Sequence, residues 1–231
     1  MRIKVIFFDA IDTLFKPYPD KMTLYRKKIK EITGMEISET KMKEVWDEIV
    51  MDTEEAAARD LGKNKLLAWD RFNQRILLLL EYQGDSALAG NQLLFETWRN
   101  PNNFRLFDDV LPTLKKLTSL GYTISCISNE DKSLYDFFEH FAIKKYFNHI
   151  VISDEIKIEK PNPLIFLKAI ELEAIRANQG LHVGDSLKSD YFGALEVGLH
   201  AVLLDREEKF QDNGDIAKIN NLSEIFNFLG E

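Results

Sequence analysis

The chain has 231 residues, enough for one large domain or two modest ones. Hydrophobic residues make up 45% and charged residues 29%, which excludes a disordered chain. Lys and Arg number 30 against 38 Asp and Glu, a net charge of -8, which argues against a protein that coats nucleic acid or binds an anionic membrane. An anionic substrate must therefore be attracted by a local device such as backbone N–H groups, a lysine or a metal ion.

The cellular context follows from what the sequence lacks. Cys126 is the single cysteine, so neither an intramolecular disulfide nor a cysteine-based zinc site is expected. The N-terminal apolar stretch stops at Asp9, too early for a signal peptide. The longest purely apolar run, residues 76–80, is far below the ~20 residues of a membrane span. We therefore predict a cytoplasmic protein, while the sequence does not indicate an oligomeric state.

Short apolar runs alternate with helical patterns along most of the chain. The runs lie at residues 3–8, 122–127, 149–152, 180–183 and 200–204. Helical spacing of apolar residues lies at 109–120, 132–141, 161–172, 187–197 and 222–229. Strands that alternate with single helices form βαβ units, so this pattern predicts an α/β fold with a Rossmann-like parallel sheet and helices on both faces.

Residues 18–100 have a different pattern, with no convincing strand. Helical stretches are predicted at residues 21–33, 38–61, 65–82 and 87–99. Ser38 is expected as the N-cap of the second stretch. The sequence thus predicts a helical domain, residues 18–100, inserted into an α/β core made of residues 1–17 and 101–231.

Polar side chains follow the predicted strands at the end where ligands bind in open parallel sheets. They are Asp9, Ser128, Asn129, Lys160, Asp185 and Asp190. Carboxylates that face one another repel unless a hard cation lies between them, and Mg²⁺ prefers such oxygen ligands. With that charge offset, a carboxylate can attack an electrophilic phosphorus. Ser128 can hold phosphate oxygens, and Lys160 can balance the charge of the transferring group.

The order and spacing of these residues resemble the four motifs of the haloacid dehalogenase-like (HAD) superfamily of hydrolases. The first is Phe-Phe-Asp9-Ala-Ile-Asp-Thr-Leu-Phe, and the second is Ser128-Asn129. Lys160-Pro-Asn-Pro163 and Gly184-Asp-Ser-Leu-Lys-Ser-Asp190 follow as the third and fourth. The resemblance covers the whole chain, because the helical insertion is similar to that superfamily's cap domain.

The resemblance implies a role for each of these residues. Asp9 would be the covalent nucleophile and a Mg²⁺ ligand, and Lys160 would stabilise the intermediate. The other protein ligands of Mg²⁺ would be Asp185, Asp190 and the backbone carbonyl of Ile11. Substrate phosphate would be bound by Ser128, Asn129 and Lys160.

One position departs from the superfamily's pattern. Its phosphatases usually carry a second Asp two residues after the nucleophile, as general acid and base, and this chain has Ile11 there. Asp12 is one step further along, and neighbouring side chains point about 100° apart in a helical turn and oppositely in a strand. We therefore expect Asp12 to be a turn residue rather than a substitute acid.

Three functions remain open on the sequence alone. The first is a Mg²⁺-dependent phosphatase that acts on a small phosphorylated metabolite through an aspartyl-phosphate, without the usual acid. The second is a metal-free 2-haloacid dehalogenase, an enzyme class that also lacks the second Asp. The third is a non-catalytic binding protein with the same fold. The carboxylates of the Gly184–Asp190 segment favour the first over the second, and the retention of Asp9, Lys160 and Asp185 speaks against the third.

Overall fold

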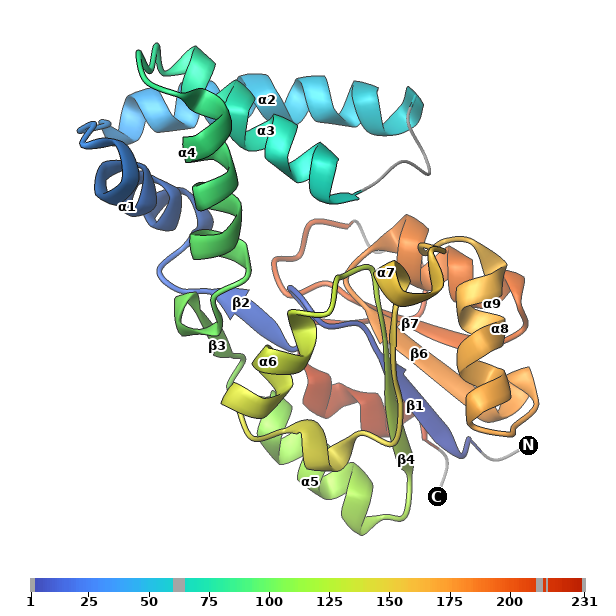
Figure 1. Cartoon of the computed structure of the whole chain (residues 1–231). Coiled ribbons are helices and arrows are strands. Elements are labelled where there is room, and N and C mark those ends of the chain that lie inside the picture. The colour runs from blue at the N-terminus through green and yellow to red at the C-terminus, as the bar shows by residue number, and fades with distance from the viewer. Residues whose placement is uncertain (1–2, 60–64, 211–213, 215, 230–231) are drawn as a thin grey trace. The chain divides into compact units, whose positions relative to one another are not determined.

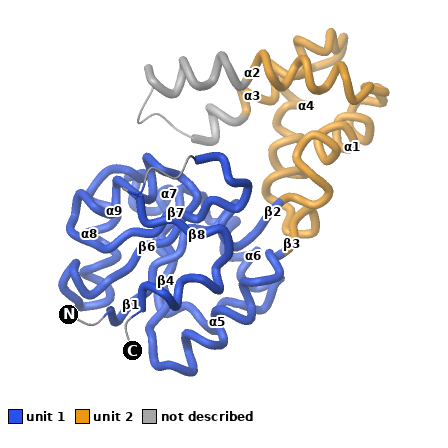
Figure 2. The backbone as a smooth tube through the Cα atoms, turned by 180° about the vertical axis from the view of Figure 1, so that it is seen from behind, with its two compact units in different colours: residues 1–16, 106–231 blue, residues 17–105 orange. Residues whose placement is uncertain are grey.

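The computed structural model describes residues 3–59, 65–210, 214 and 216–229. The chain divides into two compact units, residues 1–16 with 106–231 and residues 17–105 (Figure 2). The end of the helix predicted at residues 38–61 lies outside the described residues. No helix in the described part of the chain is long and apolar enough to cross a membrane.

The first unit is built on a sheet of six parallel strands in the order β5-β4-β1-β6-β7-β8 (Figure 1). The strands are β1 (Val5–Phe8), β4 (Thr123–Ser128), β5 (Ile150–Ile152), β6 (Gly180–Gly184), β7 (His200–Leu204) and β8 (Lys218–Ile219). β1 lies between β4 and β6, so the strand order reverses beside it. Such a reversal opens a crevice at the carboxyl ends of the strands, where ligands bind in sheets of this kind. The predicted α/β fold is confirmed.

Helices cover both faces of this sheet (Figure 1). They are α5 (Val110–Ser119), α6 (Leu134–His140), α7 (Ser153–Ile156), α8 (Pro163–Leu172), α9 (Gly193–Glu196) and a 3₁₀-helix, Leu222–Phe228. All four residues of β1 are buried, because a parallel sheet with helices on both sides exposes neither face. Val5 and Phe7 share one core cluster with Phe166 of α8.

Two of the helices predicted for this unit differ in type from the observed ones. The helix expected at residues 187–197 begins as a π-helical segment, Leu187–Phe192, and only then continues as α9. The closing helix is a 3₁₀-helix rather than an α-helix. β8 was not predicted, because a strand of two residues shows no alternating or apolar pattern.

Apart from strand residues at its two boundaries, the described secondary structure of the second unit is helical. Its longer helices are α1 (Lys21–Thr33), α2 (Glu39–Arg59), α3 (Lys65–Leu79), α4 (Ser86–Leu93) and a π-helical segment, Leu94–Trp98. Asp20 caps α1 by accepting a hydrogen bond from the backbone N of Thr23 at 3.0 Å. Gly34 ends it with φ 76°, a left-handed conformation that costs glycine little. Ser38 accepts a hydrogen bond from the backbone N of Lys41 at 3.1 Å, the bond expected of a cap.

A buried polar network crosses the core of this helical unit. The Tyr25 hydroxyl donates to Asn73 Oδ1 at 2.8 Å and accepts from Trp98 Nε1 at 2.6 Å. Asn73 Nδ2 in turn donates to the backbone O of Gly90 at 3.2 Å. These bonds tie α1, α3 and the α4 region together, and they satisfy polar groups whose burial would otherwise be costly.

A separate pair of short strands, β2 (Phe15–Pro17) and β3 (Phe104–Leu106), pairs where the chain passes between its two units. The two chain segments that join the units, one around residue 16 and one around residue 105, thus pair in one two-stranded sheet. These strands were not predicted, because each has a charged residue, Lys16 or Arg105, at the centre of its three residues. That residues 18–100 serve as a cap domain remains a prediction.

Candidate active site

The loop after β1 places Asp9 at the carboxyl edge of the sheet. The backbone N of Asp9 still bonds to Val183 O of β6, at 2.9 Å, so this residue continues the strand. The chain then turns sharply, and the Ala10 carbonyl accepts a hydrogen bond from Leu14 N at 2.6 Å. This turn brings the buried Thr13 hydroxyl 3.2 Å from Asp9 Oδ2, to which it donates.

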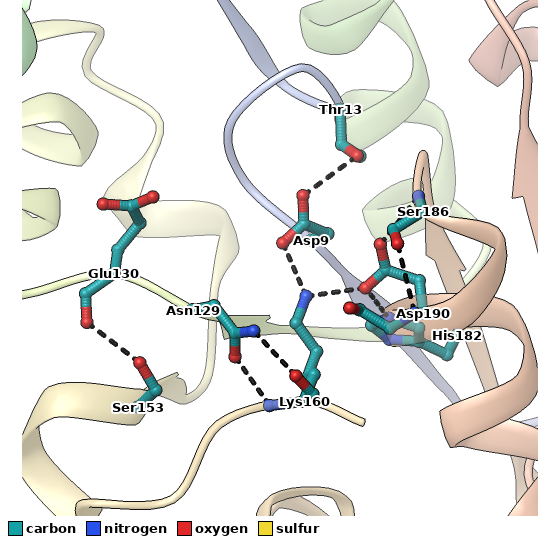
Figure 3. Close-up of polar contacts among 10 residues, drawn as sticks. Asp9, Thr13, Asn129, Glu130, Ser153, Lys160, His182, Ser186 and Asp190 are labelled. Carbon is teal, nitrogen blue, oxygen red and sulfur yellow. Dashed lines mark hydrogen bonds and ion pairs between the residues drawn. The ribbon is translucent and has the colours of Figure 1, made fainter. Parts of the chain in front are cut away.

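Lys160 lies at the centre of the site (Figure 3). Its Nζ donates to Asp9 Oδ1 and to Asp190 Oδ1, each at 2.6 Å, and its side chain is only 2% exposed. The main chain of Lys160 is held by Asn129, whose Oδ1 accepts from Lys160 N at 2.7 Å and whose Nδ2 donates to Lys160 O at 2.9 Å. The end of β4 thus fixes the lysine that bridges the two carboxylates.

The π-helical segment after β6 turns the Asp190 carboxylate back toward the strand end. The Ser186 carbonyl accepts hydrogen bonds from Asp190 N and from Tyr191 N. The second bond spans five residues, which is the wider spacing of a π-helix. Asp190 Oδ2 accepts from Ser186 N at 3.0 Å, which closes the turn. A glycine is required at position 184, because a Cβ there would collide with the Asp190 carboxyl group.

His182 of β6 contacts the Asp190 carboxylate. Its side chain is fully buried in β6, and Nε2 lies 2.9 Å from Asp190 Oδ1 (Figure 3). This distance places a proton on Nε2, donated to the carboxylate. Asp190 therefore receives hydrogen bonds from Lys160, His182 and the Ser186 backbone, and both of its oxygens are engaged.

The electrostatics of the site separate Asp185 from Asp190. Burial raises the pKa of Asp190, but Lys160 and His182 outweigh that effect and hold its pKa well below the usual range. Burial and the negative charges of Asp9, Asp190 and Asp12 raise the pKa of Asp185 from 3.8 to about 8. In the same way, burial raises the pKa of Asp9, although Lys160 opposes the shift. Burial lowers the pKa of Lys160, but its two carboxylate partners reverse this and raise it above the usual value.

These residues fit a divalent cation. Asp9, Asp185 and Asp190 each offer a carboxylate oxygen within 4.8 Å of the others, while one lysine supplies the compensating positive charge. The buried Asp9 and Asp190 and the partly buried Asp185 face one ammonium, so an excess of negative charge remains. This excess adds to the effect of burial in raising the pKa of Asp185. Oxygen donors of this kind suit Mg²⁺. The predicted Ile11 carbonyl lies in the loop directly after Asp9, and Asp12 occupies a left-handed turn position with φ 61°.

The structure brings most of the predicted site residues together, and their roles stay predictions. Ser128 is the buried last residue of β4, next to the strand that carries Asp9. Asn129 was predicted to bind substrate, but both ends of its amide bond to the main chain of Lys160. Sequence reasoning gave no role to Thr13 or His182. Their positions could have indicated one, because Thr13 lies within the first motif and His182 lies two residues before Gly184 on one strand.

A family model described as a haloacid dehalogenase-like hydrolase matches residues 3–198 of this chain. The curated protein "Haloacid dehalogenase-like hydrolase domain-containing protein 3" of Danio rerio is 33% identical over 129 residues, 56% of this chain and 52% of that protein. "Glyceraldehyde 3-phosphate phosphatase" of Pyrococcus abyssi is 29% identical over 206 residues, 87% of this chain and 80% of that protein. The chain spans about half the length of the first curated relatives that it matches.

Solved structures with the same fold are named for different activities. A HAD phosphatase from Thermococcus onnurineus matches with a TM-score of 0.69 and 23% identity, over 99% of this chain and 98% of that one. A 2-haloacid dehalogenase from Pseudomonas syringae matches with a TM-score of 0.62 and 23% identity, over 98% of both chains. At these identities the likeness shows the fold alone.

Proposed function

The chain belongs to the haloacid dehalogenase-like hydrolases, and within that family we propose that it is a Mg²⁺-dependent phosphatase of small phosphorylated metabolites. One observation carries the proposal: the carboxylates of Asp9, Asp185 and Asp190 lie close together, and the single lysine beside them bonds to Asp9 and Asp190 only. Burial and the neighbouring negative charges raise the pKa of Asp185 to about 8. A dehalogenase that works without metal has no need of this excess negative charge. A phosphatase needs it to hold Mg²⁺ beside the phosphate.

The metal ligands would be Asp9, Asp185 and the Ile11 carbonyl, with Asp190 acting directly or through water. When bound, Mg²⁺ would offset the charges of phosphate and carboxylate and polarise the phosphoryl oxygens. Asp190 already receives three donors in the protein, so it suits a supporting role, and Asp185 is the more available ligand.

Asp9 would act as the nucleophile. Its carboxylate is oriented by Lys160 at Oδ1 and by Thr13 at Oδ2, so its freedom of rotation is already restricted before substrate arrives. A carboxylate oxygen forms a bond to phosphorus, and the bond from phosphorus to the ester oxygen breaks, leaving its electron pair on that oxygen. Water then attacks the aspartyl-phosphate, which releases inorganic phosphate and restores the Asp9 carboxylate.

The remaining residues would bind and balance the phosphoryl group. Ser128, buried at the end of β4, would donate its hydroxyl to a phosphoryl oxygen. Lys160 would offset the charge that develops on the transferring group, since its raised pKa keeps it an ammonium at neutral pH. Asn129 would act through Lys160 by holding its main chain.

The substrate is expected to be a small phosphate ester or acyl phosphate in the cytoplasm. Ile11 cannot donate a proton, so the leaving oxygen must take its proton from water or leave without one. Substrates with good leaving groups are therefore favoured. Curated relatives named glyceraldehyde 3-phosphate phosphatase make triose phosphates a sensible part of any test panel.

The proposal is tested by phosphate release from a panel of phosphorylated metabolites, with Mg²⁺ and with a chelator. We expect Mg²⁺-dependent turnover by the parent and none by Asp9→Asn. The matched control is Asp136→Asn, which removes an exposed carboxylate of α6 and should keep the parent rate. Phosphatase activity that persists in Asp9→Asn would contradict the role of Asp9. Chloride release from 2-chloropropionate without metal would instead establish the dehalogenase.

A further inference from the structure

Arg206, two residues beyond β7, binds two segments of the first unit at once. Its guanidinium donates to both oxygens of Asp109, at 2.8 and 3.0 Å. The same Nη2 that donates to Asp109 Oδ1 also donates to the backbone O of Thr13 at 2.9 Å. Arg206 therefore links the end of β7, the start of α5 and the loop that carries Asp9.

This contact is largely shielded from water. The Arg206 side chain is 13% exposed and that of Asp109 is 7% exposed. The guanidinium also stacks over the Phe107 ring, 3.7 Å from its centroid. Asp109 Oδ2 accepts a further bond from Leu222 N at 2.8 Å, which anchors the carboxylate from the C-terminal 3₁₀-helix.

Because burying such an ion pair is costly, the role we assign to it is to hold the Thr13 carbonyl in position. A buried ion pair contributes little net stability, because desolvating both charges offsets their attraction. Its planar, bidentate contact does fix the position of what it binds. Here the bound group is the carbonyl of a residue whose hydroxyl donates to the nucleophile, since Thr13 Oγ1 lies 3.2 Å from Asp9 Oδ2.

We infer that Arg206, held by Asp109, is a positioning residue for Asp9 that acts through Thr13. The inference rests on the proposed function for its catalytic readout. Without Arg206 the Thr13 end of the loop loses its attachment to β7 and α5, although Phe107 N still bonds to the Leu14 carbonyl at 3.1 Å. The Thr13 hydroxyl and the carboxylate that it orients would then occupy a wider range of positions.

The contacts explain why arginine is needed. A lysine offers a single ammonium, which cannot make two parallel bonds to Asp109, reach the Thr13 carbonyl and stack on Phe107 together. Arg206→Lys should therefore recover little of the function, and Arg206→Met should have the full effect. The matched control is His149→Gln. It removes the ring nitrogen that lies 2.8 Å from the buried Glu173 carboxylate, a contact of the same unit that does not involve the nucleophile loop.

Steady-state kinetics with para-nitrophenyl phosphate give the catalytic readout. A displacement of about 1 Å can cost a reaction about 100-fold, and we expect kcat of Arg206→Met to fall about 10- to 100-fold. KM should change by less than about threefold, since Arg206 does not reach the phosphate. His149→Gln should retain the parent kcat. A loss confined to KM would overturn the inference.

A double-substitution cycle tests whether Arg206 acts through Thr13. Thr13→Val should lower kcat by a similar factor, and Arg206→Met should then add at most about twofold in the Thr13→Val background. Independent, multiplying effects of the two substitutions would overturn the proposed route.

Hydrogen exchange separates this inference from the proposed function. In Arg206→Met the amides of Leu14 and Phe15, which bond to the Ala10 carbonyl, should exchange at least about tenfold faster, while those of β1 stay protected. Unchanged exchange in the loop would overturn the inference, whatever the activity. Faster exchange in a protein whose parent shows no phosphatase activity would leave the loop restraint standing and remove the proposed function.

Discussion

Replacing Asp185 with Asn should stabilise the metal-free protein at pH 8 and destabilise it relative to the parent when Mg²⁺ is present. Burial and the charges of Asp9, Asp190 and Asp12 raise the pKa of Asp185 from 3.8 to about 8. The folded protein therefore keeps this proton up to about pH 8, whereas the unfolded chain releases it near pH 4. Between these values the unfolded state binds fewer protons, so the free energy of unfolding falls as the pH rises.

The size of the effect follows from that displacement. Each pKa unit corresponds to about 1.4 kcal/mol, so the charged Asp185 carries a penalty on the order of 5 kcal/mol above pH 8. Asparagine has a similar shape and no charge, and it should recover much of this amount in a chelator at pH 8. The gain should shrink as the pH falls toward 4, where the parent's Asp185 is protonated in both states.

Mg²⁺ should reverse the order of the two proteins. A ligand that binds only the folded state stabilises it by RT ln(1 + [L]/Kd), and Asp185→Asn removes the most available ligand. Urea unfolding measures the free energy of unfolding of both proteins under four conditions, at pH 5 and at pH 8, each with chelator and with Mg²⁺. Asp190→Asn is the matched comparison, because it takes a counter-charge from Lys160 and should destabilise the protein with or without metal. The reasoning is refuted if Asp185→Asn is less stable than the parent at pH 8 in chelator, or if Mg²⁺ stabilises both equally.

Three further substitutions test other parts of the structure. Lys160→Met leaves Asp9 and Asp190 without their shared cation and should lower the free energy of unfolding, measured by thermal unfolding, by about 3 kcal/mol. The control Lys168→Met breaks an exposed pair with Glu171 and should lower it by less than about 1 kcal/mol. Ile11→Asp should raise kcat/KM for alkyl phosphates by about tenfold or more relative to aryl phosphates, measured over esters whose leaving groups differ in pKa. If kcat/KM of the parent depends only weakly on the leaving-group pKa and Asp12→Asn makes that dependence steep, Asp12 is the acid instead. Tyr25→Phe removes a hydroxyl that serves Asn73 and Trp98 and should cost about 2 kcal/mol in urea unfolding, while Tyr18→Phe, on an exposed ring, should cost almost nothing.

The long elements of this fold could be predicted from sequence because their apolar patterns are strong. The observed α1 matches the predicted range of residues 21–33, and β7 matches 200–204. β2 and β3 have three residues each and a charged residue at the centre, so no apolar run marks them, whereas the three apolar residues of β5 do form such a run. The π-helical start of the segment at 187–192 was also missed, because its cause is not local apolar spacing. The Asp190 carboxylate bonds back to Ser186 N, and the wider turn accommodates that contact.

Some residues of the candidate site could likewise be predicted from sequence, and others could not. Asp9, Lys160 and Asp185 could be found because each follows a recognisable strand or precedes a helix at the carboxyl edge of the sheet. The supporting contacts depend on three-dimensional pairings between distant segments. Asn129 meets Lys160 across 31 positions, and Arg206 meets Thr13 across 193. No spacing rule links such pairs, so their roles emerge only when the sheet order is known.

The loop at residues 10–15 shows why an acid is hard to replace at this site. The turn that brings the Thr13 hydroxyl to Asp9 requires Asp12 to adopt the left-handed conformation, with φ 61° and its N–H bonded to the Phe15 carbonyl. Asp tolerates that conformation better than most residues, so its presence at position 12 has a backbone reason that is separate from proton transfer. Moving the acid from position 11 to position 12 would make one side chain serve both the turn and the leaving group. The hydrogen bonds that Asp9 receives from Thr13 and Lys160 involve neither side chain, Ile11 nor Asp12. On the proposed function, Asp9 can therefore stay in place as the nucleophile without an acid at position 11, and the choice of substrate depends on the leaving group.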